Sequence, residues 1–141
     1  MASKPVKYAA KIEDTPVDSA LKKDDGWHLA IRWLFDEKSH GTQYGTVGYA
    51  VIPPGGGRHE LHLHENAEEL TYYIRGRGIR TVGDEQFEVA AGEFGFVPAG
   101  VPHSMRNPST TEPLEVVCIY AGAPSLEKSG YRFLSKMTDI E

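Results

Sequence analysis

The stretch GGGRHELHLHENAEELTYYIRGRG, residues 55–78, places three histidines within six positions. Residues 59–64 contain leucines between polar side chains, a pattern that indicates a β-strand with two different faces. In such a strand His62 and His64 lie on the same face, about two strand rises apart. Two imidazoles at this separation can bind one metal ion. The stretch therefore predicts a metal site.

A carboxylate and a further histidine extend this site. Residues 65–68 read as a turn, so we expect the strand at 69–75 to run back beside the first and to aim Glu69 at the two histidines. His103 follows the rigid turn PAGVP and opens another strand. Three imidazoles and a carboxylate suit Fe, Mn, Co, Ni or Zn. The candidate metal ligands are His62, His64, Glu69 and His103.

These residues fall in two spaced patterns that resemble the signature motifs of the cupin superfamily. The first is Gly56, five residues, His62-Leu63-His64, four residues, Glu69, six residues and Gly76. The second is Gly92, five residues, Pro98, one residue, Gly100, two residues, His103, three residues and Asn107. Every signature position is present, and residues 77–91 form a short spacer similar to that of small single-domain microbial members.

The resemblance implies an all-β fold, a small jelly-roll-like barrel. It also implies one divalent transition metal per chain (Fe, Mn, Ni, Co or Zn), bound inside by the four candidate ligands. The remaining sequence agrees, because 15 glycines and 9 prolines separate short β-like runs. The runs are 28–35, 45–52, 59–64, 69–75, 78–83, 85–90, 94–98, 102–107 and 114–121.

The chain of 141 residues fits one domain. We expect a polar N-terminal arm at 1–25, the barrel at 26–123 and a C-terminal tail at 124–141. Within the arm, residues 17–25 could form a short helix. Within the tail, residues 125–134 are expected to be irregular or to form a brief helical turn.

Composition excludes some partners and suggests a compartment. The formal net charge of −5 argues against nucleic acid, because binding phosphates requires a basic face. The lone cysteine, Cys118, cannot form an intramolecular disulfide, and we expect its side chain to be buried in a strand. Neither a signal peptide nor a membrane span is recognisable. We therefore expect a cytoplasmic protein that does not bind membranes.

The catalytic residues are not identifiable from the sequence, but three candidates lie near the ligands. Tyr73 shares the strand face of Glu69 and is expected either to line the cavity or to pack in the core. His59 faces away from His62 by strict alternation, unless a β-bulge turns it inward as a fifth ligand or a base. Arg58 is expected on the His62 face, near the rim, where it would bind an anionic substrate or be solvated.

The sequence also predicts where other side chains of this region lie. Glu60 is expected on the His62 face. Phe94, Phe96 and Met105 are expected to be either walls of a substrate pocket or core. The remaining arginines of the region are expected to lie in a solvated hairpin turn; they are Arg75, Arg77 and Arg80.

Leu61 and Leu63 would point outward if the histidines point inward. An apolar outer face has to be covered by the N-terminal arm or by a second subunit. The sequence therefore predicts a homodimer.

Four protein ligands on an ion that prefers six leave two open positions, which is typical of a catalytic site. We expect a metal-dependent enzyme that acts on a small carbonyl, enol or aromatic substrate, with a dioxygenase as the first hypothesis. A polyketide-type cyclase, an isomerase or a lyase is the alternative within enzymes. A non-catalytic cupin that binds a ligand or a metal is the alternative outside them.

Overall fold

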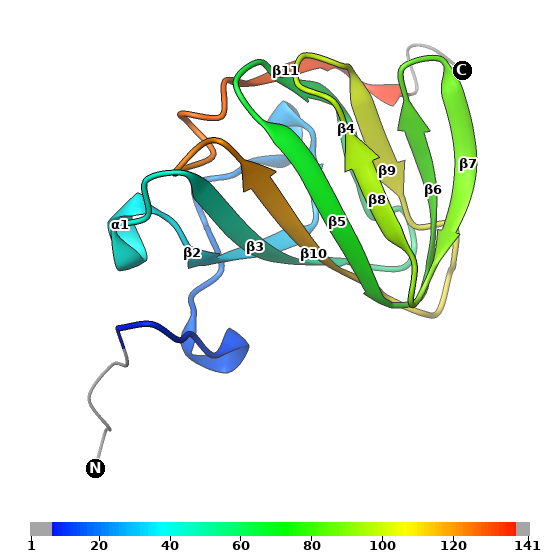
Figure 1. Cartoon of the computed structure of the whole chain (residues 1–141). Helices are drawn as coiled ribbons and strands as arrows, with labels where there is room; N and C mark the ends of the chain where they lie inside the picture. Colours follow the sequence, from blue (N-terminus) through cyan, green and yellow to red (C-terminus); the bar gives the residue numbers. More distant parts are fainter. Residues whose placement is uncertain (1–6, 138–141) are drawn as a thin grey trace.

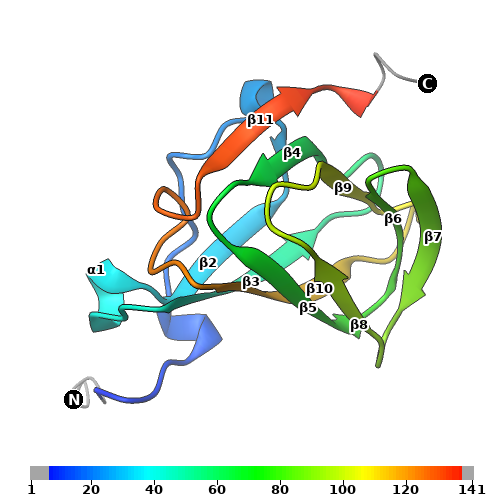
Figure 2. The same ribbon diagram turned by 45° about the horizontal axis from the view of Figure 1, so that its top comes forward.

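The structure, a computed structural model, describes residues 7–137. Two antiparallel sheets curve around a common core as a small jelly-roll-like barrel (Figure 1, Figure 2). One sheet has the order β1 (Trp27–His28), β4 (Arg58–His64), β9 (His103–Arg106), β6 (Arg77–Val82) and β7 (Glu85–Ala90), and β11 (Tyr131–Ser135) also pairs with β4. The other has the order β2 (Ala30–Phe35), β3 (Gly45–Ile52), β10 (Leu114–Ala121), β5 (Glu68–Arg75) and β8 (Phe94–Val97). The predicted all-β barrel is confirmed.

Alternation along the strands explains why these segments form a barrel. In β10, every second side chain is buried, beginning with Leu114 and ending with Tyr120. The same period of two runs through β5, where Glu69 and Tyr73 point inward. Residues with this pattern bury one face of the sheet and leave the other outside, which is how two sheets enclose a core.

One structural prediction about the ligand strands is wrong. β5 does not run back beside β4, because β5 pairs with β10 and β8 in the opposite sheet. β4 instead pairs with β1, β9 and β11. Glu69 therefore approaches the two β4 histidines from across the barrel. The turn at 65–68 carries the chain from one sheet to the other.

The N-terminal arm lies along β2, and of the predicted helix over 17–25 only the last three residues are helical. Val17 forms an isolated antiparallel bridge with Arg32, and the Trp33 indole N–H donates to Asp18 at 2.8 Å. These contacts favour an extended backbone, and the predicted helix is replaced by a 3-10 turn, η2 (Lys23–Asp25). The other short helices are η1 (Ile12–Asp14) and α1 (Glu37–His40).

The C-terminal segment is more regular than expected. Residues Tyr131–Ser135 form β11, which pairs with β4 so that Tyr131 lies opposite His64 and Phe133 opposite His62. Residues 125–130 form a bend and turns, as expected, whereas residues 131–134 of the same predicted segment belong to the sheet that carries two candidate ligands. Residues 1–6 of the predicted arm and 138–141 of the predicted tail lie outside the described residues.

Two residues of the motifs have structural roles. Gly76 has a φ of +89°, and a Cβ there would lie 2.3 Å from the carbonyl oxygen of Pro113, so the position requires glycine. The Asn107 amide donates to the carbonyl oxygens of Ile52 and Glu112 at 3.0 and 2.8 Å. These bonds join the end of β3 to the loop before β10.

The exposed apolar surface lies on a different sheet from the one expected. Leu63 is only 6% exposed within the single chain, so the outer face of β4 is largely covered. In contrast, Phe94 is 79% and Phe96 53% exposed on β8, which makes them neither pocket wall nor core. Further exposed apolar side chains, Leu70, Tyr72 and Ile74, extend this patch over the neighbouring strand β5. Within residues 7–137, no helix has the length and apolarity to cross a membrane.

Candidate metal centre

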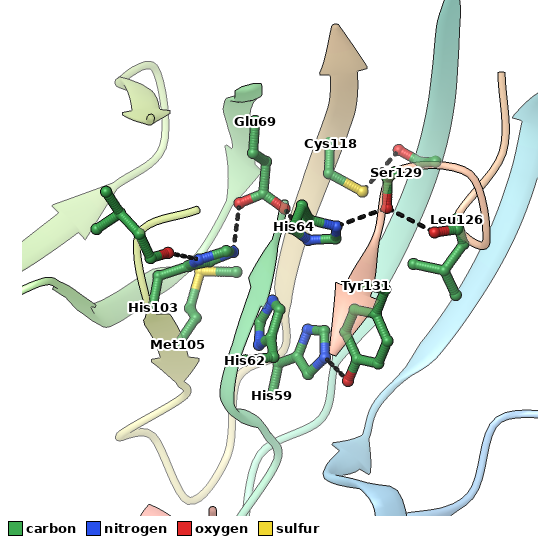
Figure 3. A network of polar contacts seen from close by, with 12 residues as sticks. His59, His62, His64, Glu69, His103, Met105, Cys118, Leu126, Ser129 and Tyr131 are labelled. Carbon is green, nitrogen blue, oxygen red and sulfur yellow. Dashed lines mark hydrogen bonds and ion pairs between the residues drawn. The ribbon is translucent and has the colours of Figure 1, made fainter. Parts of the chain in front are cut away.

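The four predicted ligands converge inside the barrel from three strands (Figure 3). β4 supplies His62 and His64, β9 supplies His103, and β5 supplies Glu69. One donor atom from each lies within 4.8 Å of the others, and all four side chains are buried. A set of nitrogen and oxygen donors at these separations matches the size of a coordination sphere around one transition-metal ion.

Hydrogen bonds on the far side of each ring orient two of the imidazoles. Nδ1 of His62 lies 2.6 Å from the carbonyl oxygen of Glu60, and Nδ1 of His103 lies 2.9 Å from that of Val101. A carbonyl oxygen only accepts, so Nδ1 carries the hydrogen in both rings. The lone pair of each ring is consequently on Nε2, the atom that faces the centre.

His64 is oriented by the C-terminal segment. Its Nδ1 lies 2.8 Å from the hydroxyl oxygen of Ser129, and that hydroxyl lies 2.5 Å from the carbonyl oxygen of Leu126. Because a serine hydroxyl has one hydrogen and donates it to Leu126, it accepts from His64. Ser129 thus selects the same tautomer as the two carbonyls do. The sequence pattern around Ser129 gives no signal of this role.

The three Nε2 atoms provide the test of whether the residues fit a metal ion. Those of His62, His64 and His103 are buried and have no hydrogen-bond partner among the residues that the structure describes. Leaving a buried polar atom unpaired costs about 1–3 kcal/mol, so three in one place require a common partner. A cation satisfies three lone pairs and a carboxylate together. The donor set therefore fits a divalent metal.

Burial determines the protonation of these rings. It lowers the pKa of His64 to about 4 and also lowers that of His103. The pKa values of His62 and His59 are well below the ordinary range for the same reason. The four imidazoles are therefore neutral at neutral pH, which is the form that binds metals.

Glu69 is ionised because of a buried arginine. Burial alone would raise the pKa of Glu69, but the adjacent Arg80 guanidinium outweighs it and lowers the value to about 2. Arg80 donates to Glu69 and is 3% exposed. The prediction that Arg80 is solvated is wrong, whereas Arg75 and Arg77 are exposed as expected. Only the inward parity of Arg80 on its strand could have indicated its position.

A bulge in β4 places His59 on the ligand side. His59 pairs with Met105 and His62 pairs with His103, so β4 contains one extra residue between the two pairs. The His59 ring stacks on the His62 ring with centroids 3.6 Å apart, and its Nε2 lies 3.1 Å from the Tyr131 hydroxyl (Figure 3). Side chains therefore do not alternate strictly between the two faces of β4 at this point. His59 points inward, as expected for a strand with a β-bulge.

The same bulge moves Arg58 and Glu60 away from the ligands, contrary to expectation. Nε of Arg58 lies 2.6 Å from Oε1 of Glu60. Glu60 is fully buried, and its other oxygen accepts from the backbone N–H of Met137 at 3.2 Å. Arg58 and Glu60 form an ion pair beneath the C-terminal segment rather than part of the site.

A small cavity of about 30 Å³ lies beside the candidate ligands His62 and Glu69. This volume holds about two water molecules, since one requires roughly 10–15 Å³. Its polar wall includes His59, His62, Glu69, Thr71 and Arg80. Its remaining wall is formed by Trp27, Leu29, Ile31, Ala50, Ile52, Met105, Val116, Cys118 and Tyr120.

Tyr73 and Cys118 differ in their relation to the cavity. Tyr73 is fully buried in the core cluster with Ile52 and Leu114 and is not part of the cavity wall. Cys118 is buried as predicted, and burial raises the pKa of its thiol to about 12. At neutral pH the wall therefore contains a thiol and no thiolate.

Comparison with known sequences identifies relatives of this barrel. The Cupin domain family model matches residues 48–120. An uncharacterized protein of Methanocaldococcus jannaschii is 37% identical over 73 residues, which cover 52% of this chain and 57% of that protein. A probable oxalate decarboxylase of Arthroderma benhamiae is 37% identical over 82 residues, which cover 53% of this chain and 20% of that enzyme. The chain thus spans little more than half of the first relative and a fifth of the second.

Solved structures show the same fold. The oxalate decarboxylase of Lactobacillus farciminis, a formate complex, aligns with a TM-score of 0.71 and 22% identity over 92% of this chain and 36% of that one. The oxalate decarboxylase of Bacillus subtilis, described as having Mn(II) centres, aligns with a TM-score of 0.66 and 25% identity over 75% of this chain and 28% of that one. With the family match spanning half of its length, the chain belongs to the cupin family.

Proposed function

We propose that this protein is a metal-dependent cupin enzyme that acts on a small carbonyl or carboxylate compound. The observation that supports it is the convergence of three unpaired Nε2 atoms and an ionised carboxylate next to a small cavity, whose wall includes His62 and Glu69. A structural metal would need no cavity beside it. A buried cluster with adjoining space favours a site that admits a further ligand.

His62, His64, Glu69 and His103 would hold the metal, and a bound divalent ion would supply Lewis-acid chemistry at a substrate oxygen. The chain itself holds the imidazoles in the Nδ1–H tautomer and keeps Glu69 ionised. Of the three catalytic candidates predicted from the sequence, His59 is the best placed to act on a substrate. Its ring forms part of the cavity wall, where it can exchange a proton with a bound substrate.

The dimensions of the site favour a small substrate over a ring-bearing one. A cavity of about 30 Å³ accepts only a few non-hydrogen atoms unless the wall moves. Among the substrates expected from the sequence, a small carbonyl or enol fits this space better than an aromatic compound.

Two reactions remain as candidates for this site. A dioxygenase agrees with the ligand set, because Fe(II) with open positions can bring a substrate and O₂ together. A lyase that cleaves a carbon–carbon bond is supported by the sequence and fold likeness to oxalate decarboxylases. We retain the dioxygenase as the first hypothesis of the sequence and add the lyase on the strength of this likeness.

Metal analysis followed by turnover measurements tests the proposal. Protein purified without added metal is analysed for Fe, Mn, Ni, Co and Zn, and an oxygen electrode then follows reactions with small keto and carboxylic acids. Net oxygen consumption in proportion to substrate loss supports a dioxygenase. Substrate loss with release of a fragment and without net oxygen consumption supports a lyase. Failure to bind any of these metals would refute the proposed enzyme.

A further inference from the structure

A buried guanidinium in the cavity wall has N–H donors that the proposed function leaves unused. Arg80 reaches into the barrel from β6 and donates through Nη2 to Glu69. Its Nη1 lies 3.6 Å from the sulfur of Met105, and a thioether is a weak acceptor. A guanidinium has five N–H donors, so these two contacts leave Arg80 with capacity for a stronger acceptor.

A count of charges in the cavity wall favours an anion as that acceptor. Without metal, Glu69 and Arg80 neutralise each other, and they are the cavity-lining side chains with a formal charge at neutral pH. A divalent ion on the four ligands adds two positive charges that no described residue of the wall offsets. A buried excess of positive charge is costly unless an anion offsets it.

We infer that Arg80 binds the substrate, and that the substrate is a small carboxylate or a comparable oxyanion. This inference rests on the proposed function, because the uncompensated charge arises only when the metal is bound. A guanidinium presents its N–H donors in one plane, so the donors that Glu69 does not use can bind two carboxylate oxygens. Unless its wall moves, the cavity limits such an anion to a few non-hydrogen atoms.

A second pocket adjoins the cavity, and we expect an anion to enter from it. An open pocket of about 450 Å³ shares Trp27 and Leu29 with the cavity wall. Its lining includes Lys23 and Arg58, the latter paired with Glu60 behind it, and, within the described part of the chain, no carboxylate side chain. Movement of the two shared side chains would join the pocket to the cavity.

Calorimetric titration of the zinc-loaded protein with oxalate tests this inference without depending on turnover. The zinc content is measured first for the wild type, for Arg80→Met and for Arg77→Met. The second variant is a matched control, because Arg77 lies on the same strand but its side chain is 75% exposed. We expect Arg80→Met to bind oxalate about 10- to 100-fold more weakly, as for loss of a charged hydrogen bond, and Arg77→Met to bind as the wild type does.

The outcomes separate the two proposals. If Arg80→Met retains zinc and binds oxalate as tightly as the wild type, the role of Arg80 is refuted and the metal site stands. If the wild type takes up no zinc or other divalent metal, the proposed function fails and this inference with it. If Arg80→Met does not fold or loses zinc, a crystal structure of the wild-type zinc–oxalate complex decides. An oxalate oxygen within hydrogen-bond distance of Arg80 supports the inference, and its absence overturns it.

Discussion

The hydroxyl oxygen of Ser129 accepts the Nδ1 hydrogen of His64 at 2.8 Å, although 65 positions separate the two residues. This contact ties the C-terminal segment to a candidate ligand on β4. Loss of a group that orients a ligand typically costs 10- to 100-fold in metal affinity. We therefore expect Ser129→Ala to weaken zinc binding about 10-fold while the protein still folds.

Competition titration with a coloured chelator measures this affinity. Ser135→Ala is the matched control, because Ser135 lies on β11 beside β4 but pairs with Leu61 rather than with a ligand. Equal dissociation constants for Ser129→Ala and the wild type would show that the tautomer of His64 is fixed without Ser129.

Removal of an imidazole ligand should abolish metal binding and spare the fold. We expect His62→Ala and His103→Ala to lose most bound metal, because each deletes one of three Nε2 donors. The core clusters are supplied largely by apolar strand residues, so circular dichroism should retain the β signal. Full metal occupancy in either variant would mean that the metal binds elsewhere.

Replacement of Glu69 separates metal binding from stability. Glu69→Gln should weaken metal binding less than either histidine deletion, because the amide oxygen can still coordinate. The metal-free variant should nevertheless be less stable by about 3 kcal/mol, because Arg80 is left as a buried unpaired charge. Urea denaturation in the presence of a chelator measures this loss. The double variant Glu69→Gln/Arg80→Met should recover much of it, and no recovery would argue against the ion pair as its cause.

The stability of the metal-free protein should fall as the pH is lowered. The pKa of His64 is about 4 in the folded protein and about 6.5 when unfolded, so the unfolded chain takes up the proton first. This stabilisation is present above pH 6.5 and decreases toward pH 4, by about 2 kcal/mol at pH 5 for His64 alone. The lowered pKa values of His62 and His103 act in the same direction. Glu69, whose pKa falls to about 2, extends the loss below pH 4.5.

Urea denaturation with a chelator at pH 7.5 and pH 5 tests this dependence. The free energy of unfolding should be lower at pH 5, and His64→Gln should reduce the difference between the two values. Equal free energies at both pH values would mean that the buried imidazoles accept protons as readily as the unfolded ones do.

The predicted homodimer requires an exposed apolar surface. We expect it to form through the outer face of β5 and β8, where Phe94 and Phe96 are exposed, rather than through Leu61 and Leu63. Light scattering coupled to size exclusion should report about twice the chain mass of 15.6 kDa. Phe96→Glu should yield a monomer, and Tyr44→Glu, at an exposed loop position, should not. A monomeric wild type at micromolar concentration would contradict this prediction.

The sequence by itself determined the barrel and the set of candidate ligands. Spaced motifs were sufficient, because His62, His64, Glu69 and His103 stand at fixed intervals between turns that the chain encodes locally. Strand positions followed for the same reason, since alternation and Gly/Pro turns depend on near neighbours.

Only the tertiary structure decided what surrounds those ligands. The β4 bulge depends on the pairing of β4 with β9, and it exchanges His59 for Glu60 on the inner face. The burial of Arg80 depends on Glu69 reaching it from the opposite sheet. The role of Ser129 depends on β11 joining β4 far from it in sequence. Each of these contacts joins segments whose meeting is set by sheet pairing, and sheet pairing is not encoded in any local pattern.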